Sequence, residues 1–202
     1  MAYPTVSAPY GLKPINLIGG QVFAGATRQI PIASGSGTSI FYGDVVSLNT
    51  GGTLSRTATT ATGSVIGVFL GCQYTNPTTK QLLQTQYYPT GTVASDIVAY
   101  VCDDPDTLFK VAVVSGTTTM SGVTRSAVGQ NTSYVINDGS TNTGDSACAV
   151  LATTDTETTL PFRIVDVVPE TANAAGSYTE VIVKFNFGIH QYYNAAATAV
   201  SA

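Results

Sequence analysis

Residues 96–114 (DIVAYVCDDPDTLFKVAVV) contain two apolar runs of strand length separated by a short acidic break. The runs at 97–102 and 108–114 are rich in the β-branched and aromatic residues that suit a pleated surface. Within 103–106, the proline fixes φ and lacks an N–H, and the aspartates bond to nearby backbone amides. We therefore expect two buried strands joined by a tight acidic turn, a hairpin onto which both ends of the chain add sheet.

Short apolar or alternating runs recur between Gly, Pro, Asn and Asp clusters along the whole chain. Residues 40–48 (IFYGDVVSL) are followed by Asn-Thr-Gly-Gly at 49–52, a turn with glycine where φ is positive, and by a return strand at 53–56. No stretch has a convincing amphipathic helical period. The pattern predicts an all-β fold, with a jelly-roll-like sandwich after a smaller β-barrel-like part.

The sequence also predicts the remaining strands, loops and bulges of this fold. Residues 80–88 are expected to form an edge strand or an irregular loop, and a polar tract at 152–159 follows the strand expected at 147–151. In the strand at 65–74, Gly67 and Gly71 indicate bulges or close backbone approach. Further strands are expected at 15–18, 21–23, 28–32, 65–74, around Val123 within 122–129, and at 133–136, 147–151, 161–168 and 178–187.

The chain divides into three expected parts. Residues 1–14 carry three prolines and read as an extended arm that orders against a neighbouring subunit or partner, the alternative being a disordered tail. Residues 15–95 would form the small N-terminal part, and 96–202 the sandwich with a short C-terminal tail. A single continuous domain is the alternative to this division.

Charged side chains are scarce in this sequence. Only 10% of the residues are charged and 44% are apolar, with a mean hydropathy of +0.20, whereas ordinary soluble domains have about 25% charged residues. A surface so short of charge has little electrostatic protection against association. We expect the chain to bury surface against partners as well as in its own core. A neutral, threonine-rich monomer is the alternative.

The formal net charge of −4 is unevenly distributed. Residues 1–95 hold four basic residues and one acid, a balance of +3, whereas residues 96–202 hold four basic residues and eleven acids, a balance of −7. This polarity suits orientation on an acidic partner surface, although chance explains it equally well at such low charge density. Because no two basic residues are adjacent, no nucleic acid partner is expected.

Cys72, Cys102 and Cys148 are far apart and lie among apolar or small residues. An odd number without CxxC spacing is a poor disulfide framework and a poor zinc site, so buried free thiols and folding in a reducing cytosol are expected. The N-terminus lacks a charged region followed by an apolar core, and no apolar run approaches the roughly 20 residues of a membrane span. We expect neither a secretory signal nor a membrane partner.

The sequence offers little catalytic chemistry. His190, the only histidine, is expected at the surface or an interface after the last strand. No G-x-S-x-G elbow occurs, and Gly35-Ser36-Gly37 lacks the strand–helix context of a dinucleotide site. We therefore expect no enzyme, no catalytic residue and no cofactor.

An aspartate cluster and two tyrosine pairs are candidates for ligand sites. Asp103, Asp104 and Asp106 carry the hard oxygens that Ca²⁺ prefers, but they lack EF-hand spacing and are expected to serve as turn residues without a metal. Tyr87-Tyr88 and Tyr192-Tyr193 are candidates for a carbohydrate site on a jelly roll. Packing or interface roles are the favoured interpretation of both pairs, because tyrosine combines a large rigid contact area with a polar tip.

Four segments carry a family resemblance: APYGLKPINLIGGQ, IFYGDVVSLNTGG, GVFLGCQYTNPTTKQ and DIVAYVCDDPDTLFKVAV. In this order they resemble head decoration, or cement, proteins of tailed phages that infect cyanobacteria and other aquatic bacteria. The resemblance covers most of residues 8–114 and is looser afterwards. The second segment also resembles the β-tulip module of several phage decoration proteins, which implies a β-tulip-like N-terminal part.

The resemblance implies a non-enzymatic protein that folds in the host cytoplasm and joins the virion. It would bind the outer surface of the expanded icosahedral shell as a homotrimer, with the major capsid protein and its own copies as partners, and stabilise the packed head. The positive N-terminal half would face the shell or a neighbouring subunit. Contact is expected from Tyr3, Tyr10, Leu12, Lys13, Pro14, Ile15, Leu17 and Arg28.

Other virion roles compete with this one. A head fibre or a receptor-binding component with a carbohydrate-binding jelly roll would have the same β-rich pattern. The major capsid protein itself usually needs a long helix, for which this sequence has no pattern.

Overall fold

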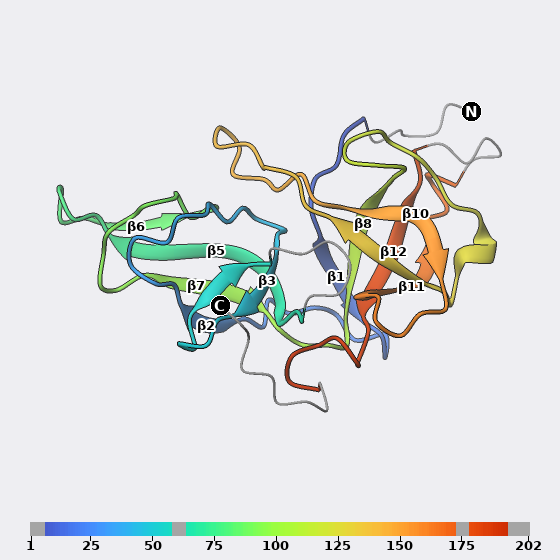
Figure 1. The fold of residues 1–202 in the computed structure, drawn as a ribbon, viewed down its shortest axis with the longest axis horizontal. Coiled ribbons are helices and arrows are strands. Elements are labelled where there is room, and N and C mark those ends of the chain that lie inside the picture. The colour runs from blue at the N-terminus through green and yellow to red at the C-terminus, as the bar shows by residue number, and fades with distance from the viewer. Residues whose placement is uncertain (1–6, 58–63, 173–177, 194–202) are drawn as a thin grey trace.

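The computed structural model describes residues 7–57, 64–172 and 178–193 and shows two lobes side by side, each built on a six-stranded sheet (Figure 1). In these ranges the one helical element is a 3₁₀ turn, η1 (Arg125–Ala127). No helix in the described ranges is long and apolar enough to cross a membrane. The all-β class predicted from the sequence is confirmed.

The N-terminal lobe holds the sheet with strand order β2-β7-β5-β3-β4, and β6 pairs with β5. Its strands are β2 (Arg28–Pro31), β3 (Val45–Leu48), β4 (Leu54–Arg56), β5 (Gly67–Thr75), β6 (Leu82–Thr85) and β7 (Val98–Cys102). A parallel bridge between Ile32 and Leu54 draws the two outer strands together. The curled sheet encloses an apolar core that includes Phe69, Tyr88 and Val101.

The C-terminal lobe contains a closed five-stranded barrel. The strands of this lobe are β1 (Lys13–Leu17), β8 (Thr107–Val114), β9 (Asn131–Val135), β10 (Ala149–Asp155), β11 (Phe162–Val167) and β12 (Glu180–Phe185), of which β1 lies outside the ring. The order β8-β10-β9-β11-β12 returns to β8 by a direct β12–β8 pairing, which closes the ring. Inside it, the Phe185 ring packs 5.3 Å from Phe109 and 5.2 Å from Phe162, measured between ring centroids.

The predicted hairpin at residues 96–114 is wrong. β7 pairs with β2 and β5 in the N-terminal lobe, whereas β8 pairs with β1, β10 and β12 in the C-terminal lobe. At Phe109 and Lys110 both edges of β8 are occupied, by β1 and β12, so no edge is left there for β7. The acidic turn at 103–106 is therefore the crossing between the lobes, and β1 belongs to the sheet of the C-terminal lobe.

Several local predictions are confirmed. β3 and β4 form the expected hairpin, in which the Asn49 amide donates to the Thr53 carbonyl over 2.8 Å and Gly52 has φ +70°. β6 is an edge strand on β5. A Cβ on Gly67 would lie 2.2 Å from the Cys102 carbonyl oxygen, so a side chain there would collide with the crossing. Three buried, unpaired thiols match the expectation for the cysteines: Cys72, Cys102 and Cys148.

Three other local predictions are wrong. At 21–23, in place of the expected strand, only Val22 forms an isolated bridge, to Asn16. Instead of a strand around Val123, the segment ends in η1, where the Ala127 amide donates to the Thr124 carbonyl and the Thr124 and Ser126 hydroxyls bond each other. Short hydroxyl side chains favour such local bonding over a strand ladder. β10 runs on to Asp155, beyond the end of the strand expected at 147–151, because Thr154 pairs with Thr132 of β9.

A buried ion pair lies where the two lobes meet. Asp44 is inaccessible, and its Oδ2 accepts a hydrogen bond from the Phe41 amide over 2.8 Å and lies 3.1 Å from Arg56 Nε. Its Oδ1 accepts from the Ser146 hydroxyl over 2.6 Å and from the Cys148 thiol over 3.2 Å. Because Ser146 and Cys148 belong to the C-terminal lobe, one carboxylate bonds to both lobes.

Arg56, at the end of β4, spans the same boundary. Its guanidinium donates to the Asn137 carbonyl and, over 3.0 Å, to Asp138 Oδ1, both in the C-terminal lobe. Burial opposes the charged form, but the Asp44 carboxylate raises the pKa of Arg56, so the side chain stays charged. Removing one member of such a pair leaves the other as an uncompensated buried charge.

We predict that Asp44→Ala lowers the free energy of unfolding by about 3–5 kcal/mol, because it removes the buried carboxylate that pairs with Arg56 and leaves only the 96% exposed Asp138 opposite the guanidinium. The measurement is urea unfolding followed by circular dichroism. Arg125→Ala is the matched control, since it breaks an ion pair with Asp166 in which the Arg125 side chain is 78% exposed, and it should cost less than about 1 kcal/mol. Equal, small losses for both variants would contradict the role given to Asp44.

Candidate interaction surface

The acidic turn between β7 and β8 sends its three carboxylates to different partners. Asp103 Oδ2 lies 2.6 Å from Arg28 Nε, and Asp106 Oδ1 lies 3.6 Å from Lys184 Nζ. Asp104 Oδ1 instead accepts a hydrogen bond from the Asp106 amide over 2.9 Å, which is the expected turn chemistry. Within the described ranges, no group of three or more His, Cys, Asp or Glu residues is arranged to hold a metal ion.

His190 is fully buried against this turn, so the expectation of a surface histidine is wrong. Its Nε2 lies 3.0 Å from the Asp103 carbonyl oxygen. The position follows from the segment after β12, which turns back onto the other lobe: the Val65 amide donates to the Ile189 carbonyl, and the Gln191 amide donates to the Val65 carbonyl. The imidazole thus becomes part of the contact between the lobes.

Aromatic rings surround the imidazole and continue to the surface. The His190 ring centroid lies 5.7 Å from that of Phe185 inside the barrel and 5.6 Å from those of Tyr192 and Tyr193. Phe187 meets Tyr193 edge-on with centroids 5.2 Å apart. Unlike Phe185, the outer three rings are about half exposed to solvent. The stack therefore links a buried core to an accessible aromatic patch.

Two cations lie over these exposed rings. The Arg28 guanidinium carbon is 5.0 Å from the Tyr192 ring centroid, and Lys184 Nζ is 4.5 Å from that of Phe187. Ile18, also half exposed, is tied to the acidic turn because its amide donates to the Asp106 carbonyl. We name this region the seam surface and define it by six residues: Ile18, Arg28, Lys184, Phe187, Tyr192 and Tyr193.

The seam surface has the composition of a protein-binding site. Aromatic residues and arginine are enriched at the centres of protein interfaces, where they supply large, rigid contact areas. Ile18, Lys184 and Phe187 line a hollow of about 370 Å³ that is floored by the barrel residues Ile164 and Phe185. Cation–π contacts of the kind seen here contribute about 0.5–1 kcal/mol when exposed and more when a partner removes the water.

Three of the eight contact residues predicted from the sequence are used inside the chain: Tyr10, Leu12 and Lys13. Leu12 is fully buried in the core, so its predicted role as a contact is corrected: its side chain is not available to a partner. The Tyr10 hydroxyl donates to Glu180, and burial together with this carboxylate raises the pKa of Tyr10. Lys13 Nζ lies 2.7 Å from Asp145 Oδ1. Tyr3 lies outside the described residues.

The rest of the predicted set lies nearer the surface. Pro14, Ile15 and Leu17 are half-buried on β1, and the Arg28 side chain is 59% exposed. Only Arg28 belongs to the seam surface, and Leu17 precedes one of its members. The sequence pointed to Tyr192-Tyr193 as a pair, but it gave no signal that the segment after β12 folds back beside Arg28.

Comparisons with protein-family models, with curated proteins and with solved structures found no match for this chain. The resemblance of residues 8–114 to phage decoration proteins therefore stays a prediction. The function must be inferred from the residues and geometry of the chain itself.

We predict a pH dependence that comes from His190. Burial lowers its pKa below the ordinary value of 6.5, although the Asp103 carbonyl opposes this. At a pH between the pKa of His190 in the folded chain and its higher pKa in the unfolded chain, the unfolded chain binds one more proton than the folded chain. The contribution of His190 to the free energy of unfolding is therefore complete above the unfolded pKa, and it is lost as the pH falls from the unfolded to the folded pKa. Urea unfolding at a series of pH values should show this loss in the natural chain and a smaller loss in His190→Gln.

A direct measurement accompanies this comparison. Because the chain has one histidine, nuclear magnetic resonance can follow a single imidazole through the titration, and its midpoint should lie below that of an unfolded peptide. Parallel stability curves for the two proteins, or an ordinary midpoint, would contradict the prediction.

Proposed function

We propose that this chain is a non-enzymatic decoration protein that binds the outer surface of an expanded phage capsid as a homotrimer and stabilises the packed head. The observation that carries the proposal is the seam surface, where exposed aromatic rings lie beside Arg28 and the largely buried Lys184 on a chain with very few charges. The resemblance over residues 8–114 supplies the identity of the partner, the major capsid protein.

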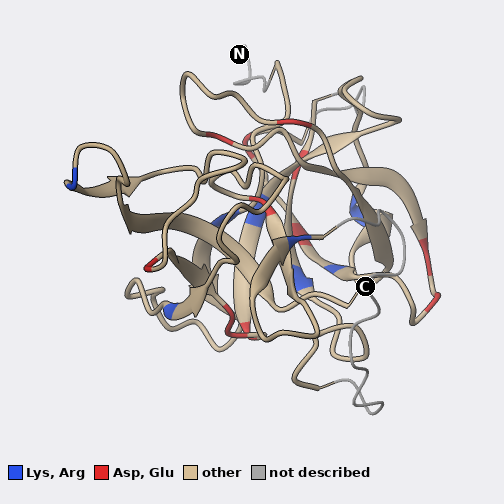
Figure 2. Ribbon diagram, turned by 60° about the vertical axis from the view of Figure 1, so that its left-hand side comes forward, with Lys and Arg blue, Asp and Glu red and all other residues tan. Residues whose placement is uncertain are grey.

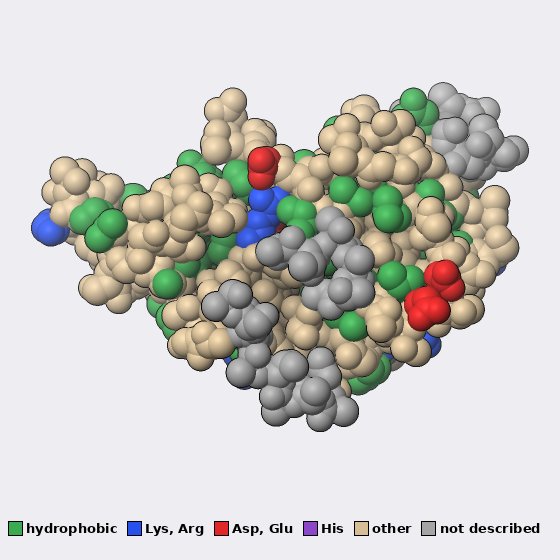
Figure 3. All heavy atoms as spheres, in the orientation of Figure 1, with side chains coloured by type: hydrophobic (Ala, Val, Ile, Leu, Met, Phe, Trp, Pro, Cys, Tyr) green, Lys and Arg blue, Asp and Glu red, His purple; other side chains and the backbone are tan. Residues whose placement is uncertain are grey.

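The surface of the molecule supports a role in a permanent assembly. Figure 2 shows that charged residues are sparse along the ribbon, and Figure 3 shows hydrophobic side chains at many points of one face with few charged groups between them. Such a surface loses little hydration energy when it is covered, and it gains from the burial of apolar area. Trimer formation and docking on a shell would both cover it.

The groups that nucleophilic catalysis would use are occupied structurally. Burial raises the pKa of both Cys102 and Cys148 to about 11, so neither thiol ionises readily near neutral pH. His190 is buried and its Nε2 faces the Asp103 carbonyl. These side chains contribute to packing between the lobes, which supports a structural function.

The mechanism of stabilisation would be mass action. A protein that binds the assembled shell and not the separated capsomers raises the free energy needed to disrupt the shell. A trimer also gains avidity from the repeated sites of an icosahedral surface. We expect the seam surface to contact either the shell or a neighbouring copy.

The proposal predicts that capsids lacking this protein retain DNA to a higher temperature once the purified chain is added. The double variant Phe187→Ser with Tyr192→Ser should lose most of this protection, because it removes two exposed rings of the seam surface. Tyr178→Ser is the matched control: this exposed tyrosine precedes β12, at the opposite end of the strand from Phe187. DNA release on heating is the measurement, and circular dichroism checks that each variant is folded.

Unchanged DNA retention with the natural chain would contradict stabilisation. Equal protection by all variants would exclude the seam surface as the contact. Sedimentation equilibrium tests the trimer separately, because it should give three times the chain mass of 20.8 kDa; a monomer at micromolar concentration would contradict that part.

A further inference from the structure

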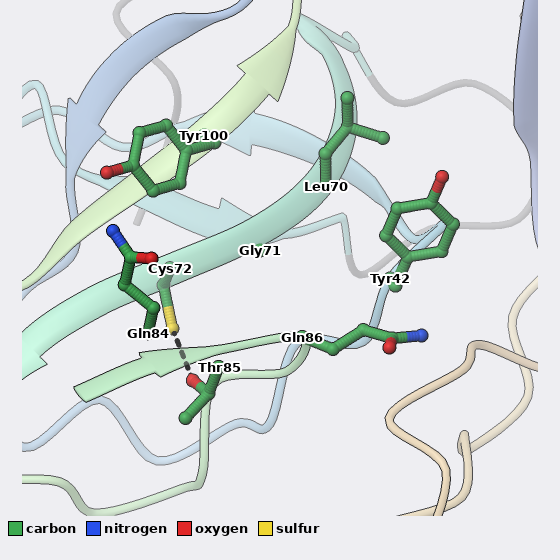
Figure 4. Close-up of a pocket in the computed structure, with 8 residues that line it drawn as sticks. All are labelled: Tyr42, Leu70, Gly71, Cys72, Gln84, Thr85, Gln86 and Tyr100. Carbon is green, nitrogen blue, oxygen red and sulfur yellow. Dashed lines mark hydrogen bonds between the residues drawn. The ribbon is translucent and has the colours of Figure 1, made fainter.

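We infer that a groove on the outer face of the N-terminal lobe binds a neutral, hydroxyl-rich ligand, that is, a carbohydrate. The groove is a hollow of about 500 Å³ beside β5, β6 and β7 (Figure 4). It is lined by Tyr42, Leu70, Gly71, Cys72, Gln84, Thr85, Gln86 and Tyr100. None of its members belongs to the seam surface, so this binding is independent of the proposed capsid function.

A β-bulge creates the space. The register between β5 and β7 shifts between Phe69 and Gly71, and Gly71 then lies opposite Tyr100. Gly71 has φ +141°, a conformation that L side chains rarely adopt, and a Cβ there would lie 3.1 Å from the Thr85 carbonyl oxygen. Since this position carries no side chain, a gap remains between the Tyr100 ring and β6.

The walls of the groove combine apolar and aromatic surfaces. Figure 4 shows Tyr100 and Tyr42 on opposite sides of Leu70, and all three side chains are half-buried. The C–H faces of a sugar ring are apolar and pack on aromatic rings, which is the large contact area that tyrosine provides. The Tyr100 hydroxyl is held in place because it donates to Gln73 Oε1 over 2.6 Å.

The polar rim consists of amide side chains. Gln84 and Gln86 are both exposed at the groove. A glutamine amide carries two donors and an acceptor, so it can bond to two neighbouring hydroxyl groups of a sugar at once. The Gln86 amide also donates to Asp145 Oδ1 over 3.1 Å, which orients it at the end of the groove nearest the C-terminal lobe.

The charge balance favours a neutral ligand over an anion. The lining residues include no Asp, Glu, Lys or Arg. The nearest ions, Lys13 and Asp145, are paired at 2.7 Å and so neutralise each other. Small-molecule sites are usually lined by apolar and aromatic side chains, with a few polar groups that orient the ligand. The groove lining offers a phosphate or an acidic peptide no cation, and the adjacent Lys13, whose Nζ lies 4.0 Å from the Tyr42 ring centroid, is already paired with Asp145.

The test is binding of the full chain to an array of neutral and anionic glycans, followed by saturation-transfer nuclear magnetic resonance with the neutral oligosaccharide that binds best. The double variant Gln84→Ala with Gln86→Ala should weaken this binding at least about fivefold, the factor that corresponds to one lost hydrogen bond. Both side chains are exposed, so the variant should fold. Gln81→Ala is the matched control, because Gln81 is also exposed, lies just before β6 and is not part of the groove lining; it should leave the affinity unchanged.

Three outcomes would overturn the inference. They are the absence of binding to neutral glycans, preferential binding of anionic glycans, and equal affinity in the natural chain and in the double variant. DNA retention by capsids carrying the double variant separates the two proposals, because the loss of glycan binding should leave head stabilisation intact.

Discussion

The buried ion pair of Asp44 and Arg56 is the interaction on which the arrangement of the two lobes depends. Each partner also bonds to the C-terminal lobe, the carboxylate through Ser146 and Cys148 and the guanidinium through residues 137–138. Asp44 is inaccessible and the Arg56 side chain is only 7% exposed, so loss of one member leaves a largely buried charge at the boundary.

The chain crosses between the lobes more than once. The segment before β1 bonds to both lobes, since the Gly11 amide donates to the Cys148 carbonyl and the Leu12 amide to the Gly43 carbonyl. After β12 the chain returns, and His190 packs against the acidic turn. These crossings place the seam surface at the boundary and leave the groove at Gly71 on the outer face of one lobe. Each candidate binding site thus depends on how the sheets are joined.

Local structure was predictable where turn chemistry was strong. The glycines at 51–52 and the alternating residues around them predicted the β3–β4 hairpin, and Gly67 was expected at a close backbone approach. The prediction of a hairpin at residues 96–114 failed because strands from elsewhere in the chain occupy the edges of β7 and β8. The sequence of β7 and β8 has the pattern of a hairpin, yet the two strands pair in different sheets. Of the predicted contact residues, Arg28 lies in the seam surface, and Leu12 is buried because residues 11–12 bond across the boundary.

The sequence by itself determined an all-β chain with few charges, three isolated thiols and a single histidine, because composition and short-range patterns decide which strands and turns form. Only the tertiary structure decided which strands share a sheet, that His190 is buried, and that Arg28 meets Tyr192 while Gly71 faces Tyr100. The physical reason is that strand pairing and burial depend on contacts between residues far apart in the chain, and local patterns leave several such pairings open.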